Sequence, residues 1–251
     1  MIGAYFQVFK QPYATYKTLE AFRYIYPDAP ILLVSDNGYD YTNMAKHFNC
    51  KYIHYTSSCP VWVNHMGDDK LYKQKILEVY QRFLESIRQL ECKYFIFLED
   101  DVLIHRPLKN ITDDDLQGAC INKINPKVLE MLKLNYSDIN PINNYFSGHG
   151  GSLYKRETIM RIFEDKELVN TVIDLSLQYR GNIFCINMCF DFFVSIMIYC
   201  LGGTIVPLEG HIDCHYWNNN CIIQHQFKVY YNKDMPEDIR WMVNTSIPHK
   251  V

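Results

Sequence analysis

The sequence predicts an α/β protein with a Rossmann-like, doubly wound and mostly parallel central sheet in a single compact α/β/α domain. In the first hundred residues, short apolar runs alternate with helical patterns, as is typical of parallel sheets. The chain has 251 residues, of which 48% are hydrophobic, so it can bury a large core. An apolar run at 94–98 ends directly in three acids, at the sheet edge where such folds bind ligands.

The elements of the first half follow from apolar periodicity and from residues that stop helices. Strands are expected at apolar runs, and helices where apolar side chains recur every three or four residues. Pro27 ends the first helix, and the turn Ser35-Asp36-Asn37-Gly38 ends the second strand. The expected strands are 3–9, 30–34, 51–55 and 94–98, and the expected helices are 12–26, 39–48 and 68–90.

The alternation weakens beyond residue 106. Helices are expected at 156–165, 167–179 and 190–201, followed by a strand at 204–207. Asp113-Asp114-Asp115 lies in polar surroundings and is interpreted as the start of a solvated helix. Because no linker or repeat is visible, the second half is expected to extend the same sheet within one domain, 1–251.

Composition and charge exclude some classes of protein and of partner. A formal net charge of −3 provides no basic field, so nucleic acid is not expected as a partner. The longest uncharged stretch, 181–208, is interrupted by Asp191 and is interpreted as core, so no membrane segment is expected. Nine irregularly spaced cysteines and no visible signal peptide predict a cytoplasmic protein with reduced thiols.

The acidic triplet Glu99-Asp100-Asp101 is the strongest indication of function. Three adjacent carboxylates repel one another, and a cation among them relieves that repulsion. Oxygen ligands suit a hard divalent ion, Mn²⁺ or Mg²⁺, which also accepts phosphate oxygens as ligands. The alternative is an ordinary acidic turn that closes a strand.

The layout of these features resembles the glycosyltransferases of the GT-A fold, the nucleotide-diphospho-sugar transferase type. The matching features are the apolar strand leading into an Asp-x-Asp-like triplet, the β-α-β half before it, a Gly-rich loop at 147–152 and an acid-bearing helix. The resemblance covers most of the chain, and the triplet departs from the motif by having Glu99 first. It implies a metal-dependent enzyme that moves a sugar from a UDP-sugar to a glycan, protein or small-molecule hydroxyl.

The resemblance also implies that the two halves of the chain bind different ligands. Residues 1–105 would form the nucleotide-sugar-binding half. Residues 106–251 would form the acceptor-binding half and a C-terminal segment that contacts the metal and the diphosphate. Asp101 would bind the metal, and Glu99 or Asp100 would meet the ribose or the sugar. In the C-terminal segment, His225 would be a further metal ligand and Lys228 would meet the diphosphate, with His211 and His215 as alternatives to His225.

The nucleotide is expected at the ends of the first two strands. Phe9 and Lys10 leave the first strand at its carboxyl end, where backbone amides can meet the base. Ser35 and Asp36 leave the second strand at the same edge, and Asp36 could accept a hydrogen bond from uracil. Asp-Asn-Gly is equally an ordinary turn sequence.

Asp191 is the candidate catalytic base. It stands among phenylalanines, and a carboxylate in such surroundings needs a function or a partner. In the resembling inverting enzymes, an acid early in such a helix accepts the proton of the acceptor hydroxyl. The competing interpretation is a carboxylate that stabilises the helix N-terminus. Before this helix, the glycines of 148–152 would shape the acceptor or sugar pocket, with Gly150 on the donor side and His149 contacting the donor sugar. The same residues could equally form only a hairpin turn.

Three other interpretations stay open. The chain could be a catalytically inactive glycan- or nucleotide-binding protein that keeps the fold. It could be a sugar nucleotidyltransferase, although the place of that class's Gly-rich loop holds Phe9-Lys10-Gln11-Pro12. A zinc cluster is the third, with a spacing that matches no common zinc module; its ligands would be His211, Cys214, His215 and Cys221.

Overall fold

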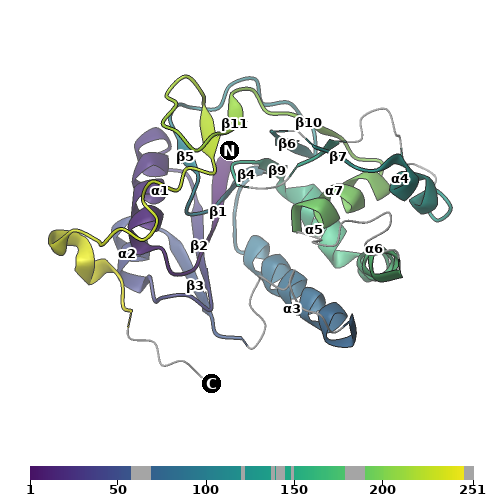
Figure 1. The fold of residues 1–251 in the computed structure, drawn as a ribbon, viewed down its shortest axis with the longest axis horizontal. Coiled ribbons are helices and arrows are strands. Elements are labelled where there is room, and N and C mark those ends of the chain that lie inside the picture. The colour runs from purple at the N-terminus through teal and green to yellow at the C-terminus, as the bar shows by residue number, and fades with distance from the viewer. Residues whose placement is uncertain are drawn as a thin grey trace.

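A seven-stranded sheet forms the centre of the protein (Figure 1). The structure, a computed structural model, describes residues 1–57, 69–119, 122–136, 139, 145–147, 150–178 and 190–245. The strands of this sheet are β1 (Ile2–Val8), β2 (Ile31–Asp36), β3 (Lys51–Tyr55), β4 (Tyr94–Leu98), β6 (Leu116–Gly118), β9 (Leu153–Lys155) and β10 (Ile205–Pro207). Their order is β10-β6-β9-β4-β1-β2-β3, and only β9 runs antiparallel to its neighbours among these strands. The mostly parallel, doubly wound α/β class is confirmed.

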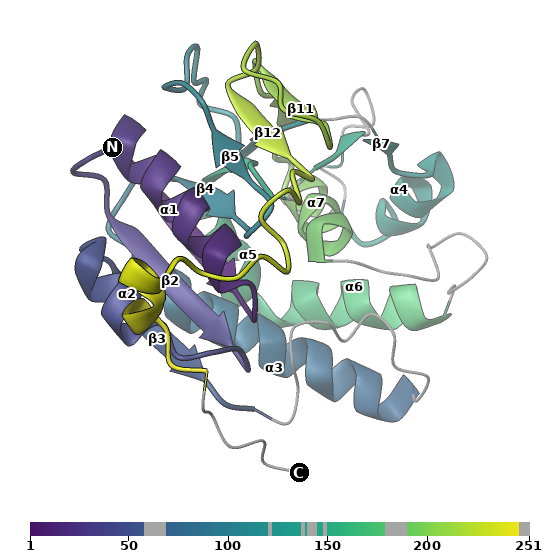
Figure 2. The same cartoon turned by 60° about the vertical axis from the view of Figure 1, so that its left-hand side comes forward.

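Helices cover both faces of this sheet (Figures 1 and 2). They are α1 (Pro12–Ile25), α2 (Thr42–His47), α3 (Asp69–Arg88), α5 (Arg156–Glu164), α6 (Lys166–Gln178) and α7 (Phe190–Cys200), with a short α4 (Pro126–Leu132) at the periphery. Side chains of a strand alternate between faces. Accordingly Phe6 of β1 packs in the core beneath α1 and α2, whereas Tyr5 packs in the core beneath α3 and α5–α7.

A second, three-stranded sheet lies beside the end of β4. Its strands are β5 (Leu103–Ile104), β11 (His211–Asp213) and β12 (Ile223–His225), in the order β11-β12-β5. β12 runs parallel to β11 and antiparallel to β5. The remaining described elements are an antiparallel pair, β7 (Asn122–Lys123) with β8 (Tyr145–Phe146), and a 3₁₀ helix, η2 (Glu237–Met242).

The expected helices and strands of the first half nearly coincide with the observed ones, and the three helices and the strand expected beyond residue 150 are also confirmed. The helix expected at Asp113-Asp114-Asp115 is wrong. Asp113 accepts a hydrogen bond from the Tyr94 hydroxyl (2.6 Å) and pairs with Lys155 (3.1 Å), so it is tied to the sheet. Asp113 also pairs with Lys93 (3.0 Å), and Asp115 accepts hydrogen bonds from the Thr158 hydroxyl and the Thr204 N–H. These contacts hold the acids in a non-helical segment that leads into β6.

Within the part of the chain that the structure describes, no helix is both long and apolar enough to cross a membrane.

Candidate metal and donor site

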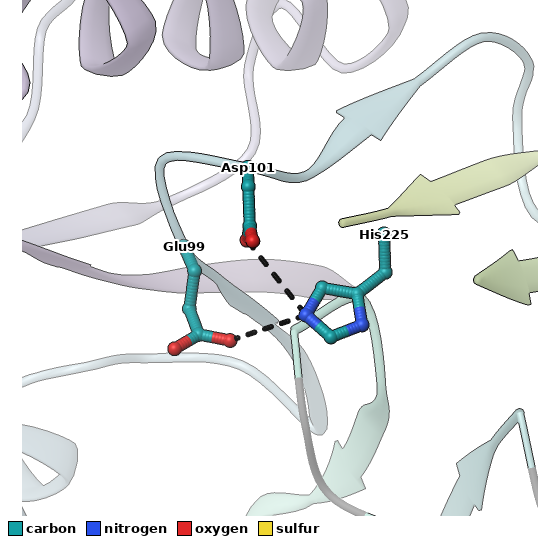
Figure 3. Close-up of side chains that lie close together, drawn as sticks. All are labelled: Glu99, Asp101 and His225. Carbon is teal, nitrogen blue, oxygen red and sulfur yellow. Dashed lines mark ion pairs between the residues drawn. The ribbon is translucent and has the colours of Figure 1, made fainter. Parts of the chain in front are cut away.

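Glu99, Asp101 and His225 converge at the carboxyl end of β4 (Figure 3). One ligand atom of each residue lies within 4.8 Å of the other two. The His225 Nε2 atom is 3.7 Å from both Glu99 Oε2 and Asp101 Oδ1. The side chains of His225 and Asp101 are only 5% and 8% exposed, whereas Glu99 is 34% exposed. The cluster is therefore two carboxylates and one imidazole, of which Asp101 and His225 are buried and Glu99 is partly exposed.

The second sheet explains how a residue from the C-terminal region reaches the acidic triplet. β5 begins two residues after Asp101, and Leu103 in β5 pairs with Gln224 in β12. His225 follows Gln224 and so lies beside the triplet. The Phe227 N–H donates to the Asp101 carbonyl (3.0 Å), and this hydrogen bond also holds the chain after β12 against the triplet.

Gly150 forms the wall of the cluster. Its N–H donates to Glu99 Oε2 at 2.9 Å and so orients the carboxylate. A Cβ atom at this position would lie 2.6 Å from Glu99 Oε2 and 2.9 Å from His225 Cδ2, both closer than non-bonded atoms approach. Only a glycine fits here without displacing a member of the cluster. Gly148 and His149 lie outside the described residues.

The substitution Gly150→Ala is expected to weaken binding of Mn²⁺ roughly tenfold or more, because the new methyl group displaces Glu99 and His225. It should also lower the free energy of unfolding by about 1–3 kcal/mol through overpacking. Gly3→Ala is a matched control, since its Cβ would crowd the Pro30 carbonyl at 2.9 Å near the start of β1, away from the cluster at the carboxyl end of β4. The control should lose stability and keep its Mn²⁺ affinity in a calorimetric titration; equal affinity in both variants would contradict this role of Gly150.

The charges of the cluster are not balanced by the protein alone. Burial raises the pKa of Asp101, and the Glu99 carboxylate raises it further, against the opposing effects of His225 and Lys228. Burial also raises the pKa of Asp100, to about 7. Burial by itself would lower the pKa of His225, but its hydrogen bonds and the nearby acids outweigh that effect and raise it to about 10. The raised pKa values of Asp101 and Asp100 mean that the site disfavours their ionised forms, whereas the raised pKa of His225 means that it favours the charged imidazole.

A divalent cation fits this arrangement. Two ligands of one small cation, each about 2.1 Å from it, lie at most about 4.2 Å apart, so separations of 3.7 Å are compatible with a shared ion. Carboxylate oxygens suit Mg²⁺ and Mn²⁺, and the imidazole nitrogen favours the transition metal of the two. Glu99 thus lies with Asp101 among the possible metal ligands, whereas the resemblance implied that Glu99 or Asp100 contacts the ribose or the sugar.

Asp100 and Lys228 lie beside the cluster without belonging to it. Asp100 accepts a hydrogen bond from the Tyr231 hydroxyl. The Lys228 ammonium lies 3.7 Å from Asp101 Oδ2, and its side chain is 52% exposed. Lys228 thus presents a positive charge to solvent at the edge of the cluster.

His211 and His215, the alternatives to His225, do not belong to the cluster of three ligands found among the described residues. His211 Nε2 lies 3.1 Å from the Gly150 carbonyl, and His215 Nδ1 lies 3.0 Å from the Gln226 carbonyl. Among the described residues, which include all of 211–225, Cys214 and Cys221 join no group of three metal-ligating side chains. The structure therefore does not support the zinc cluster.

The end of β1 runs beside the triplet. Phe6 pairs with Leu98, so the residues that follow them leave neighbouring strands at the same edge of the sheet. The Phe9 carbonyl accepts hydrogen bonds from the Tyr39 N–H (2.9 Å) and the Tyr41 hydroxyl (3.1 Å). Lys10 lies over the Phe9 ring, 5.0 Å from its centroid. Hydrogen bonds thus hold the Phe9 backbone at an edge of the sheet that adjoins the triplet.

Asp36 and Ser35, which the sequence predicts to contact the nucleotide, have hydrogen-bond partners within the protein. Asp36 is buried, and its two oxygens accept from Arg82 at 3.0 Å and from the Asn37 amide at 2.8 Å. The fully buried Ser35 donates to the Tyr39 carbonyl at 2.7 Å. A buried carboxylate requires a counterion, and Arg82 from α3 supplies it. Contact of Asp36 and Ser35 with the nucleotide stays a prediction of the sequence, since the structure shows only their protein partners.

Asp191 lies in the first turn of α7. The neighbouring Phe190 ring stacks on Phe97 of β4 at a centroid distance of 5.9 Å, which holds the start of α7 near the end of β4. One helical turn further, Ser195 exchanges two hydrogen bonds with the Ser147 backbone (2.7 and 3.1 Å). Residues four apart share a helix face. Asp191 therefore lies on the same face of α7 as Ser195, the face that contacts Ser147, three residues before Gly150. It is not a member of the Glu99 cluster.

The comparison with solved structures identifies the fold. The galactosyltransferase LgtC, in complex with donor and acceptor sugar analogs, aligns with 96% of this chain and 100% of its own, at 12% identity and a TM-score of 0.51. The chain has the GT-A glycosyltransferase fold. No family model matches the GT-A chain, and no curated protein sequence does.

Two further solved glycosyltransferases align less closely with the GT-A chain. The bifunctional glycosyltransferase WbbM aligns at 11% identity over 84% of this chain and 39% of its own, with a TM-score of 0.43. GlyE of Streptococcus pneumoniae TIGR4 aligns at 11% identity over 82% of this chain and 45% of its own, with a TM-score of 0.44.

Proposed function

We propose that the protein is a metal-dependent glycosyltransferase that transfers a sugar from a UDP-sugar to an acceptor hydroxyl. The observation that carries this proposal is the convergence of Glu99, Asp101 and His225 at the ligand-binding edge of a GT-A sheet. Among the possible acceptors we favour a glycan, because the similar LgtC structure holds donor and acceptor sugar analogs.

The three clustered side chains would hold Mn²⁺ or Mg²⁺. When bound, the ion supplies positive charge that neutralises a diphosphate leaving group. Lys228 adds a second positive charge at the same edge and is open to solvent, so it is the candidate to bind the diphosphate directly. The buried Asp101 and His225 keep the site in place, because each is tied into a sheet.

The nucleotide would bind along the end of β1, at Phe9 and Lys10. This edge adjoins the triplet through the β1–β4 pairing, so a base bound there could place its diphosphate near Lys228. Gly150 and Asp100 complete the donor side. Asp191, on the α7 face that contacts Ser147, is the candidate group for the acceptor hydroxyl.

A thermal-shift experiment with UDP, GDP and CDP, each with and without Mn²⁺, tests this function. A nucleotide present at a hundred times its dissociation constant stabilises the folded state by about 2.7 kcal/mol. We expect UDP with Mn²⁺ together to raise Tm by roughly 5–10 °C, and UDP alone to raise it much less. No shift with any pair would contradict the proposal. UDP release from a panel of UDP-sugars then separates an enzyme from a protein that only binds.

A further inference from the structure

His225 has a carboxylate on the side of its ring that faces away from the metal cluster. Asp213 Oδ1 lies 2.7 Å from His225 Nδ1, whereas Nε2 is the atom directed at Glu99 and Asp101. The imidazole therefore bridges two acidic environments, one on each nitrogen. Asp213 itself belongs to none of the three-residue groups found among the described residues.

Strand pairing holds Asp213 against His225. The two residues are direct partners in the parallel β11–β12 pair, so their side chains leave the same face of the small sheet. The Cys214 N–H donates to the His225 carbonyl (3.0 Å) and fixes the alignment of the two backbones. Asp213 is more exposed than its partner, with 27% of its side chain accessible against 5% for His225.

We propose that Asp213 is a positioning residue of the metal site, which holds the His225 ring with the Nε2 lone pair directed at the cation. This inference rests on the proposed metal-dependent function. An imidazole coordinates a metal through a nitrogen that carries no proton, so the remaining proton must stay on Nδ1. The Asp213 carboxylate accepts that Nδ1–H and blocks rotation of the ring. Carboxylate–histidine–metal arrangements of this kind raise the affinity of a site for its ion.

Loss of Asp213 would free the ring in two ways. The proton could reside on Nε2, where it would point at the ion, and the ring could rotate away from Glu99 and Asp101. We expect Asp213→Ala to weaken Mn²⁺ binding about 10- to 100-fold. Asp213→Asn should retain most of the affinity, because the amide oxygen can still accept from Nδ1. If Asp213 only supported the fold, the Mn²⁺ affinity would not fall in Asp213→Ala and recover in Asp213→Asn.

Mn²⁺ affinity of the full chain, measured by electron paramagnetic resonance without any nucleotide, tests the inference. Titrations at two pH values separate ring orientation from competition by protons for His225. Asp234→Ala, which removes an exposed acid elsewhere in the C-terminal region, is the control and should bind Mn²⁺ as the wild type does. Circular dichroism establishes that each variant folds, and if Asp213→Ala does not fold, Asp213→Asn and Asp213→Ser carry the test.

The outcomes distinguish failure of the proposed metal-dependent function from failure of the proposed role of Asp213. A wild-type protein that binds no Mn²⁺ overturns the proposed function and this inference with it. A wild type that binds Mn²⁺, with Asp213→Ala binding equally tightly at both pH values, overturns only the role of Asp213. Weak binding by Asp213→Ala with recovery in Asp213→Asn supports it.

Discussion

Asp101→Asn is expected to abolish metal-dependent UDP binding and to lower kcat/KM for sugar transfer at least a hundredfold, about 2.7 kcal/mol. Asn keeps the size of the side chain but removes the charge that attracts the ion. Because Asp101 is buried beside His225 Nε2 and Lys228, solvent cannot replace it as a ligand. Calorimetry of UDP binding with and without Mn²⁺, together with UDP release from a UDP-sugar, measures both effects.

The same substitution should stabilise the metal-free protein. Burial and the neighbouring Glu99 charge disfavour the ionised form of Asp101 and raise its pKa, so a neutral side chain is better tolerated there. We therefore expect Tm of metal-free Asp101→Asn to equal or exceed that of the wild type, while activity is lost. Gains in stability with loss of activity are typical of residues kept for function. Asp28→Asn, an exposed acid, is the control and should change neither quantity.

Unchanged Mn²⁺ dependence of UDP binding in Asp101→Asn would contradict the metal site. A fall in Tm of the metal-free variant would assign Asp101 to the ion pairs with His225 and Lys228 instead.

Asp191→Asn is expected to lower kcat by a factor of about 10²–10⁴, the usual contribution of a general base. The affinity for UDP with Mn²⁺ should stay the same, because Asp191 is separate from the Glu99 cluster. Steady-state kinetics and calorimetry measure the two quantities. If Asp191 takes the proton of the acceptor hydroxyl, NMR of the product should show an inverted anomeric configuration. A retained configuration would contradict the role as base.

Asp165→Ala, which removes a helix cap, is a control for the competing structural role of Asp191. Asp165 caps α6, and its Oδ1 accepts from the Leu168 N–H at 2.9 Å. Loss of such a cap costs about 0.5–2 kcal/mol of stability and should leave kcat unchanged. If Asp191→Asn lowers Tm in the same way and keeps wild-type kcat, Asp191 serves only to stabilise the start of α7.

The sequence by itself determined the class of fold, most of the helices and the strands of the first half. These features depend on local patterns: the apolar run of β4 and the helical spacing of apolar side chains in α1 and α3 require no knowledge of distant contacts. The triplet was also visible, because an apolar strand that ends in three carboxylates is unusual in any context.

The resemblance named Asp101 and His225, with His211 and His215 as alternatives. Only the tertiary structure selected His225 among these histidines and added Glu99 and Asp213 to its surroundings. β5, β11 and β12 have two or three residues each, too few to show a periodic pattern, yet their pairing brings His225 to Asp101 and Asp213 to His225. The pairing of Asp36 with Arg82 is likewise a contact between two elements. Residues remote in the chain become neighbours through packing of whole elements, so no local pattern in the sequence records which charges finally compensate one another.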